Sequence, residues 1–168
     1  MKIITSLFLL SITNLCIAEP YKIGEEPFDI AGKTIDGTEV KVSDYKGKVV
    51  IVSFWASWCA PCRKELPVLS GIQKSATTKH LQVISINIDG ERKLFKKLAQ
   101  NLVLGDIKLV SDASHKARKK YGVEGIPHML IIDAEGKVAA VHIGYGEEEL
   151  PGLIDEINEI ANRKPARS

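Results

Sequence analysis

Two cysteines separated by two residues, Cys59 and Cys62, constrain the fold of this chain more than any other feature. The apolar run before them, residues 49–54, has too little polar alternation for a half-exposed strand and predicts a central strand covered on both faces. After them, apolar residues recur with helical spacing at Leu66, Leu69, Ile72 and Ala76. A Cys-x-x-Cys pair at such a strand-to-helix turn indicates thiol–disulfide chemistry.

The predicted turn places the sulfur of Cys59 at the N-terminal end of the helix. Unpaired backbone N–H groups and the helix dipole favour a thiolate there, and the thiolate is the species that attacks a disulfide. We therefore predict that Cys59 is the attacking nucleophile. Cys62, one helical turn further in and less exposed, is the predicted resolving cysteine. The pair forms the predicted redox-active disulfide and needs no cofactor.

A metal site is the alternative use of such a pair. Zinc takes about four cysteine or histidine ligands, and the four histidines show no matching spacing: His80, His115, His128 and His142. We therefore expect no structural metal. Binding of a soft metal such as Cu(I) for delivery to another protein, as a copper-binding metallochaperone does, stays open as a second function of the same cysteines.

The first 18 residues predict a secretory signal peptide. Lys2 supplies a minimal positive region, residues 3–12 are apolar, and Cys16 and Ala18 are small residues at positions −3 and −1 of a cleavage site. Cleavage near Ala18 would leave a periplasmic or otherwise extracytoplasmic protein. The alternatives are a membrane anchor made by an uncleaved N-terminus, and a lipid on Cys16, which the bulky Leu15 disfavours.

The remaining residues, 19–168, are long enough for one domain with a full core. Lys2 is the only charged residue lost with the signal peptide, so 22 of the 23 Lys and Arg residues remain against 21 Asp and Glu residues. This balance gives no reason to expect nucleic acid as a partner. A disulfide between residues three apart closes a tiny loop and stabilises little, so it is better explained as redox-active. We expect a monomer.

The other predicted elements alternate between strands and helices, which is typical of a three-layer α/β sandwich. Pro67 should kink the helix after the cysteines. The last helix should begin near Glu147 and bury Leu150, Leu153, Ile154, Ile157 and Ile160. The elements between are a hairpin over 33–42, a strand over 81–89, a helix over 91–102, a short strand over 107–110, a helix between Asp112 and Gly122, and a hairpin over 129–143.

The run Trp58-Cys59-Ala60-Pro61-Cys62-Arg63-Lys64-Glu65-Leu66-Pro67 resembles the active site of thioredoxin-like proteins. More narrowly, it is similar to the extracytoplasmic thiol–disulfide oxidoreductases of the TlpA/ResA-like (redoxin) family, which are related to cytochrome c maturation. The similarity continues through 121–127 and 130–133 and covers roughly residues 24–160. It implies a thioredoxin-like three-layer α/β/α sandwich with a mixed central sheet, an N-terminal β-hairpin and a helix–short strand insertion.

The resemblance also implies roles for residues around the cysteines. The proline that matches Pro127 is cis in the family and lies against the disulfide, and Ile126 before it would pair through its backbone with a substrate segment. Without the resemblance, Pro127 reads equally well as a break between helix and strand. Ala60 and Pro61 shape the turn and so influence the reduction potential. We expect Trp58 to form part of an apolar docking surface.

Glu65 is the charged residue of most interest, because it follows Cys62 by three positions and lies near both cysteines at the start of the helix. Related reductases have a glutamate here, so one hypothesis is that it influences the cysteine pKa values and proton movement. The alternative is a solvated carboxylate that favours the helix start. Thioredoxin itself has a buried aspartate six residues before its first cysteine, where this chain has Ser53. His128 is assigned no role.

The resemblance implies an enzyme that reduces disulfides of client proteins, with apocytochrome c as one candidate and a membrane-embedded thiol transporter as the electron donor. A thiol peroxidase is the second enzymatic interpretation. It is weaker because neither Cys59 nor Cys62 has the Thr-x-x-Cys arrangement usual for peroxidatic cysteines.

Overall fold

A mixed sheet of seven strands forms the centre of the computed structural model, which describes residues 21–163. The strand order is β2-β1-β5-β4-β3-β6-β7. The strands are β1 (Ile30–Lys33), β2 (Glu39–Lys41), β3 (Val49–Trp55), β4 (Leu81–Asn87), β5 (Lys108–Ser111), β6 (His128–Ile132) and β7 (Val138–Ile143). The helices are α1 (Ala60–His80), α2 (Arg92–Asn101), α3 (Lys116–Lys120) and α4 (Leu150–Asn162), with short 3-10 helices η1 (Val42–Tyr45) and η2 (Glu147–Glu149). The predicted signal peptide lies outside the described residues.

Strand β3 is the centre of the sheet, and all seven of its residues are buried. It pairs in parallel with β4 and antiparallel with β6, so the prediction of a strand covered on both faces is confirmed. Alternate side chains of a strand point to opposite faces of the sheet. Ser53 faces α1, since it bonds to Glu65 of that helix. Phe54 faces the other side, where its ring lies 5.2 Å from that of Tyr121.

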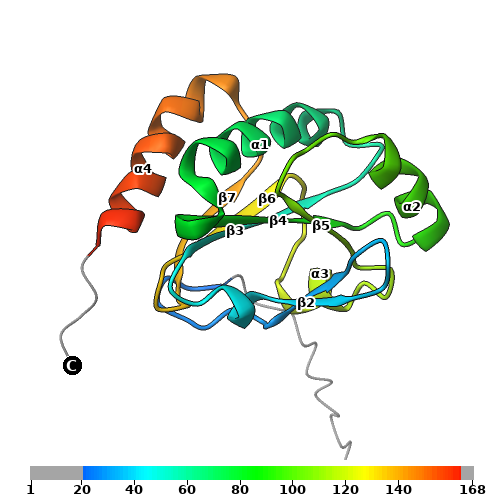
Figure 1. Ribbon diagram of the computed structural model, residues 1–168, viewed down its shortest axis with the longest axis horizontal. Coiled ribbons are helices and arrows are strands. Elements are labelled where there is room, and N and C mark those ends of the chain that lie inside the picture. Colours follow the sequence, from blue (N-terminus) through cyan, green and yellow to red (C-terminus); the bar gives the residue numbers. More distant parts are fainter. Residues whose placement is uncertain (1–20, 164–168) are drawn as a thin grey trace, which may run out of the picture.

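Figure 1 shows the layers: α1 and α4 lie on one side of the sheet and α3 lies on the other, while the β1–β2 hairpin forms one edge of the sheet. Helix α2 lies towards one end of the molecule and contacts the sheet at β5. The inserted helix with its short strand and the closing hairpin lie within one residue of their predicted bounds, whereas the N-terminal hairpin begins at Ile30, three residues before its predicted start. The predicted three-layer α/β/α sandwich with a mixed sheet is therefore confirmed.

Helix α1 extends beyond Ala76, the last residue of the apolar spacing that predicted it, but its backbone breaks directly after that residue. Thr77 has φ 61° and ψ 154° and is the only residue of α1 outside the helical region. Pro67 keeps helical backbone angles, so it is not the point at which the helix breaks. A proline fits the helical φ and removes only one hydrogen bond, which the packing of a long amphipathic helix can offset.

Helix α4 buries a narrower stripe than predicted. Ile157 and Ile160 are 5% and 2% exposed, and Leu150 and Leu153 are half-buried. Ile154 is 45% exposed, so its placement on the buried face is wrong. The four buried or half-buried residues follow i, i+3, i+7 and i+10, which is one stripe along a helix, and Ile154 lies at the edge of that stripe.

This difference along one helix can be measured. Ile157→Ala should lower the free energy of unfolding by about 2–4 kcal/mol, because it leaves a cavity against the sheet. Ile154→Ala is the matched control and should cost less than about 1 kcal/mol, since its side chain is largely solvated. Urea denaturation of the oxidised protein gives both values, and equal losses would contradict the assigned face.

Candidate active site

The two cysteines lie where β3 gives way to α1, at the start of the helix. Cys59 is the N-cap residue of α1, and its Sγ accepts a hydrogen bond from the backbone N–H of Cys62 at 3.2 Å. The two sulfurs form a disulfide. Cys59 is 5% exposed and Cys62 is fully buried, which agrees with the predicted difference in exposure. An N–H group aimed at Cys59 would stabilise the thiolate that forms when the disulfide is reduced.

The loop before β6 packs against Cys59. The Ile126–Pro127 peptide bond is cis, as the resemblance implied, and the carbonyl oxygen of Ile126 lies 3.9 Å from the Sγ of Cys59. Gly144 donates its backbone N–H to the carbonyl of Pro127 at 2.8 Å, which ties this loop to the end of β7. The structure therefore brings Ile126 and Pro127 to the cysteines across 67 residues of sequence.

Glu65 is buried, with 1% of its surface exposed. The hydroxyl of Ser53 donates to Oε2 of Glu65 at 2.7 Å, and Oε1 has no hydrogen-bond partner among the described residues. Burial raises the pKa of Glu65 to about 7, and the Ser53 bond opposes part of that rise. The interpretation of Glu65 as a solvated carboxylate is therefore wrong. The spacing along the helix predicts that Glu65 lies near both cysteines. It does not predict that the side chain is buried, because burial depends on how α1 packs on the sheet.

A cavity of about 540 Å³ reaches Glu65 from the side of β7 and α4. Met129 and His142 line it from the sheet, and Gly144, Tyr145 and Leu153 line it from the segment that leads into and along α4. Glu65 is thus almost fully buried and yet lines this cavity. A carboxyl group in that position could exchange a proton with solvent through the cavity.

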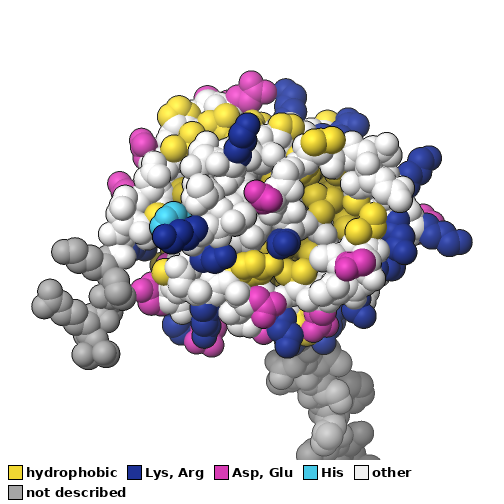
Figure 2. Space-filling model, viewed as in Figure 1, with side chains coloured by type: hydrophobic (Ala, Val, Ile, Leu, Met, Phe, Trp, Pro, Cys, Tyr) yellow, Lys and Arg dark blue, Asp and Glu magenta, His cyan; other side chains and the backbone are white. Residues whose placement is uncertain are grey.

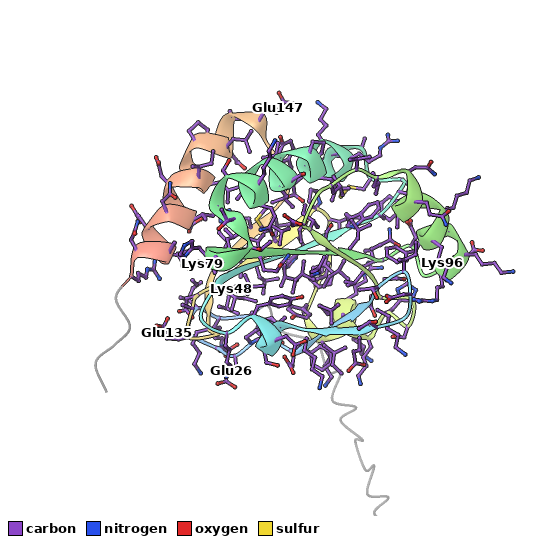
Figure 3. All side chains as sticks on the ribbon, in the orientation of Figure 1. Glu26, Lys48, Lys79, Lys96, Glu135 and Glu147 are labelled. Carbon is purple, nitrogen blue, oxygen red and sulfur yellow. A yellow bond between two sulfur atoms is a disulfide. The ribbon has the colours of Figure 1, made fainter. Side chains whose placement is uncertain are left out.

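A wide groove of about 560 Å³ lies beside the turn between the cysteines. Ala60 and Pro61 form one wall, and Tyr145 and Glu147 belong to the opposite wall. Lys64 and Glu147 form an ion pair across it at 3.3 Å, with both side chains 68% exposed, and such a solvated pair stabilises little. Figure 3 shows Glu147 near one end of α1 and Lys79 near the other.

The two tryptophans around the cysteines differ sharply in exposure. Trp58 is 71% exposed, whereas Trp55 is 2% exposed and belongs to the core. A large apolar side chain exposed to solvent beside a reactive cysteine pair can serve as a contact point for another protein.

On the face drawn in Figure 2, Lys and Arg side chains are interspersed with Asp and Glu side chains, so no region of one charge dominates that face.

His128 is buried but lies on the other face of the sheet from Glu65. It pairs with Phe54 in the β3–β6 register, and the two rings pack edge to face with centroids 6.2 Å apart. Its Nδ1 has no hydrogen-bond partner within residues 21–163, and burial lowers its pKa. His128 is therefore a neutral core side chain at neutral pH and does not join the Glu65 carboxyl.

Asp89, which no sequence pattern singled out, accepts hydrogen bonds from Ser57 in the turn before Cys59. The carboxyl ends of parallel strands lie at the same edge of a sheet. An acidic residue directly after the predicted neighbour of β3 could therefore have been predicted to lie near the cysteines. Across residues 21–163, no group of three or more His, Cys, Asp and Glu side chains is arranged to hold a metal ion. In the same part of the chain, no helix is long and apolar enough to cross a membrane.

Comparison with known proteins gives a consistent set of relatives. Residues 23–141 match the model of the AhpC/TSA family. The thiol-disulfide oxidoreductase ResA of Bacillus anthracis is 29% identical over 140 residues, which cover 83% of this chain and 80% of that protein. A Chlorobium tepidum crystal structure described as the thiol:disulfide interchange protein DsbE is 33% identical, with a TM-score of 0.76 over 84% of this chain and 99% of that one. The exposed lipoprotein thioredoxin Etrx1 of Streptococcus pneumoniae is 31% identical, with a TM-score of 0.66 over 79% and 98% of the two chains. The thioredoxin-like form of the sandwich is thereby confirmed.

The raised pKa of Glu65 should make stability depend on pH. Between the usual value of 4.5 and about 7, the unfolded carboxyl ionises while the folded one keeps its proton. The free energy of unfolding therefore falls as pH rises through this window and levels off above it. At about 1.4 kcal/mol per pH unit, the fall attributable to Glu65 is about 3 kcal/mol. Urea denaturation of the oxidised protein from pH 4 to pH 8 measures it. In Glu65→Gln, which can still bond to Ser53, this contribution should vanish, and parallel curves for the two proteins would contradict the assignment.

Proposed function

We propose that this chain, which belongs to the AhpC/TSA family and is a thioredoxin-like thiol–disulfide oxidoreductase, acts outside the cytoplasm and reduces disulfides of client proteins. The observation that carries the proposal is the Cys59–Cys62 disulfide at the first turn of α1, in which Cys59 keeps 5% of its surface exposed and Cys62 is fully buried. That asymmetry suits a cycle in which one sulfur meets the client and the other completes the exchange.

In the reductive direction, the thiolate of Cys59 attacks one sulfur of a client disulfide. A mixed disulfide forms at Cys59 and one client sulfur leaves as a thiolate. Cys62 then loses its proton, and its thiolate attacks the Sγ of Cys59. The second client sulfur leaves and takes up a proton, so the client gains two electrons and the Cys59–Cys62 disulfide forms. The N–H of Cys62, which points at Cys59, stabilises the first thiolate.

Glu65 is the candidate acceptor for the proton of Cys62. Both side chains are buried, and they lie one helical turn apart on α1. A carboxyl with a pKa of about 7 can take up and release a proton near neutral pH, which an ordinary glutamate does poorly. The cavity beside β7 would let Glu65 exchange that proton with solvent while a client covers Cys59.

The client would dock on the groove formed by Ala60 and Pro61, next to the exposed ring of Trp58. The backbone of Ile126, whose carbonyl already touches Cys59, is the expected pairing edge for an extended client segment. A strand added here would place its own sulfur above Cys59.

The proposed location follows from residues 1–18, and the relative from Streptococcus pneumoniae is itself an exposed lipoprotein. Retention of the N-terminus as an anchor, or lipid attachment at Cys16, would equally keep the domain outside the cytoplasm.

Apocytochrome c is the proposed client and a membrane-embedded thiol protein the proposed electron donor, with the chain acting as a monomer. A thiol peroxidase and a copper-binding metallochaperone are the alternative functions. Peroxide consumption that persists without Cys62 would favour the first, and copper that copurifies in stoichiometric amount would favour the second.

Cys62→Ser should trap clients as mixed disulfides on Cys59, because the resolving attack is lost. The variant is expressed in the native host, and disulfide-linked complexes are separated on non-reducing gels and identified by mass spectrometry. Cys59→Ser is the matched control and should trap none, because the buried sulfur of Cys62 cannot reach a client. Failure to recover any partner through Cys59 would count against reduction of proteins as the function.

Glu65→Gln should slow the second step of the cycle and spare the first. Loss of a positioned base costs about 100-fold or more in the step it serves. Rapid-quench measurements with a small model disulfide separate formation of the mixed disulfide at Cys59 from its resolution by Cys62. Unchanged resolution from pH 6 to pH 8 would leave Glu65 with a structural role only.

A further inference from the structure

Asp89 holds the turn that carries the cysteines. It follows β4, which runs parallel to β3 with Asn87 opposite Trp55, so it lies at the edge of the sheet where α1 begins. The backbone N–H of Ser57 donates to Oδ2 of Asp89 at 3.0 Å and to Oδ1 at 3.2 Å. The hydroxyl of Ser57 donates to Oδ1 at 3.1 Å. One carboxylate thus accepts both donors of the residue two positions before Cys59.

Asp89 is in turn held in place by buried groups. The side chain of Asn87, which is fully buried, donates to Oδ2 of Asp89 at 2.7 Å and accepts the backbone N–H of Asp89 at 3.3 Å. The backbone carbonyl of Asn87 accepts the N–H of Asp112 at 2.9 Å, and Ile88 donates to the carbonyl of Trp55 at 2.9 Å. The carboxylate therefore sits on a rigid support that reaches the core of the sheet.

The residue after Asp89 adds a further constraint. Gly90 has φ +79°, a conformation that other residues rarely adopt, and a Cβ there would lie 2.8 Å from the ring of His115. The segment that carries Asp89 is thus fixed on both sides. By contrast, residues 56–59, which form the turn that leads into Cys59, are linked to one another by a single backbone hydrogen bond, from the N–H of Cys59 to the carbonyl of Ala56 at 3.1 Å.

We propose that Asp89 is a positioning residue of the redox reaction, which acts through Ser57 to hold Cys59 in line with the N–H groups of α1 and to hold Trp58 out in solvent. The inference rests on the proposed role of Cys59 as the nucleophile. Hydrogen bonds to a carboxylate are stronger than those between neutral groups, so they can fix a turn that is otherwise half-exposed. A small displacement of a reacting atom is enough to cost much of its rate.

Two effects of Asp89 on Cys59 oppose each other. Its negative charge disfavours a nearby thiolate, whereas its tether keeps Sγ aligned with the N–H of Cys62. The carboxylate is partly exposed and its charge is offset by three donors, from Ser57 and Asn87. The tether acts on the turn directly, so its loss should dominate when Asp89 is removed.

The test is the reactivity of Cys59 in the reduced full-length protein. Alkylation by iodoacetamide is followed by mass spectrometry as a function of pH, and reduction of a small model disulfide is followed in parallel. Asp89→Ala should slow both reactions about tenfold at pH 7 and move the midpoint of the alkylation profile to higher pH. Circular dichroism and the melting temperature check that each variant is folded.

Asp133→Ala is the matched control. Asp133 also accepts a backbone N–H, from Lys137 at 2.8 Å, but it lies in the β6–β7 turn at the other end of the sheet, since Ile132 pairs with Val50. It should lose stability and keep wild-type reactivity at Cys59. A tenfold loss in this control would show that a general loss of stability explains the effect of Asp89→Ala and would overturn the proposal.

Ser57→Ala completes the experiment and serves alone if Asp89→Ala does not fold. It deletes only the hydroxyl bond, so it should slow alkylation by about twofold to fivefold and add nothing in the Asp89→Ala background. Wild-type rates in Asp89→Ala, or in Ser57→Ala when that variant stands alone, would overturn the proposal, as would additive effects in the double variant. If the wild-type Cys59 itself neither alkylates selectively nor reduces the model disulfide, the proposed function fails instead.

Discussion

The hydrogen bond from the N–H of Cys62 to the sulfur of Cys59 depends on how the chain passes from β3 into α1. A helix start offers N–H groups that lack partners within the helix, and an N-cap residue normally satisfies them with an oxygen. Here a sulfur holds that position. The Cys59 sulfur that caps the helix is therefore a stronger hydrogen-bond acceptor as a thiolate than as a thiol. The same hydrogen bond from Cys62 stabilises both the start of the helix and the ionised form of Cys59.

Such a contact works only if the turn before it is fixed, and the fold supplies that from both neighbours of β3. On one side, the loop before β6 brings the carbonyl of Ile126 to Cys59. On the other, the loop after β4 brings Asp89 to Ser57. Both loops come from strands that pair directly with β3, so the sheet register sets their distance from the sulfur. The position of the cysteine turn therefore depends on the register of three adjacent strands, β4, β3 and β6.

The sequence was sufficient for the elements and for the cysteine pair because both have short-range signals. The apolar run of β3, the helical spacing after Cys62 and the turn residues of the two hairpins each report local structure. The burial of Glu65 was not local. Its position near the helix start favours solvent exposure, and only the packing of α1 on β3, with Ser53 directly beneath, places the carboxyl inside. Ile154 shows the same limit on α4. The helical periodicity predicted which side of the helix faces the core, but it did not predict that Ile154 at the edge of that side is exposed.

Ser53 and Glu65 together form a buried polar pair whose two members come from different elements, β3 and α1. A carboxyl rising from β3 would approach the cysteines from the sheet, whereas Glu65 approaches from α1 and uses the hydroxyl on β3 as its support. The buried carboxyl of this chain therefore belongs to the same helix as Cys62. A displacement of the N-terminal end of α1 as a unit would then move Cys62 together with Glu65, the proposed acceptor of its proton, and leave the distance between them unchanged.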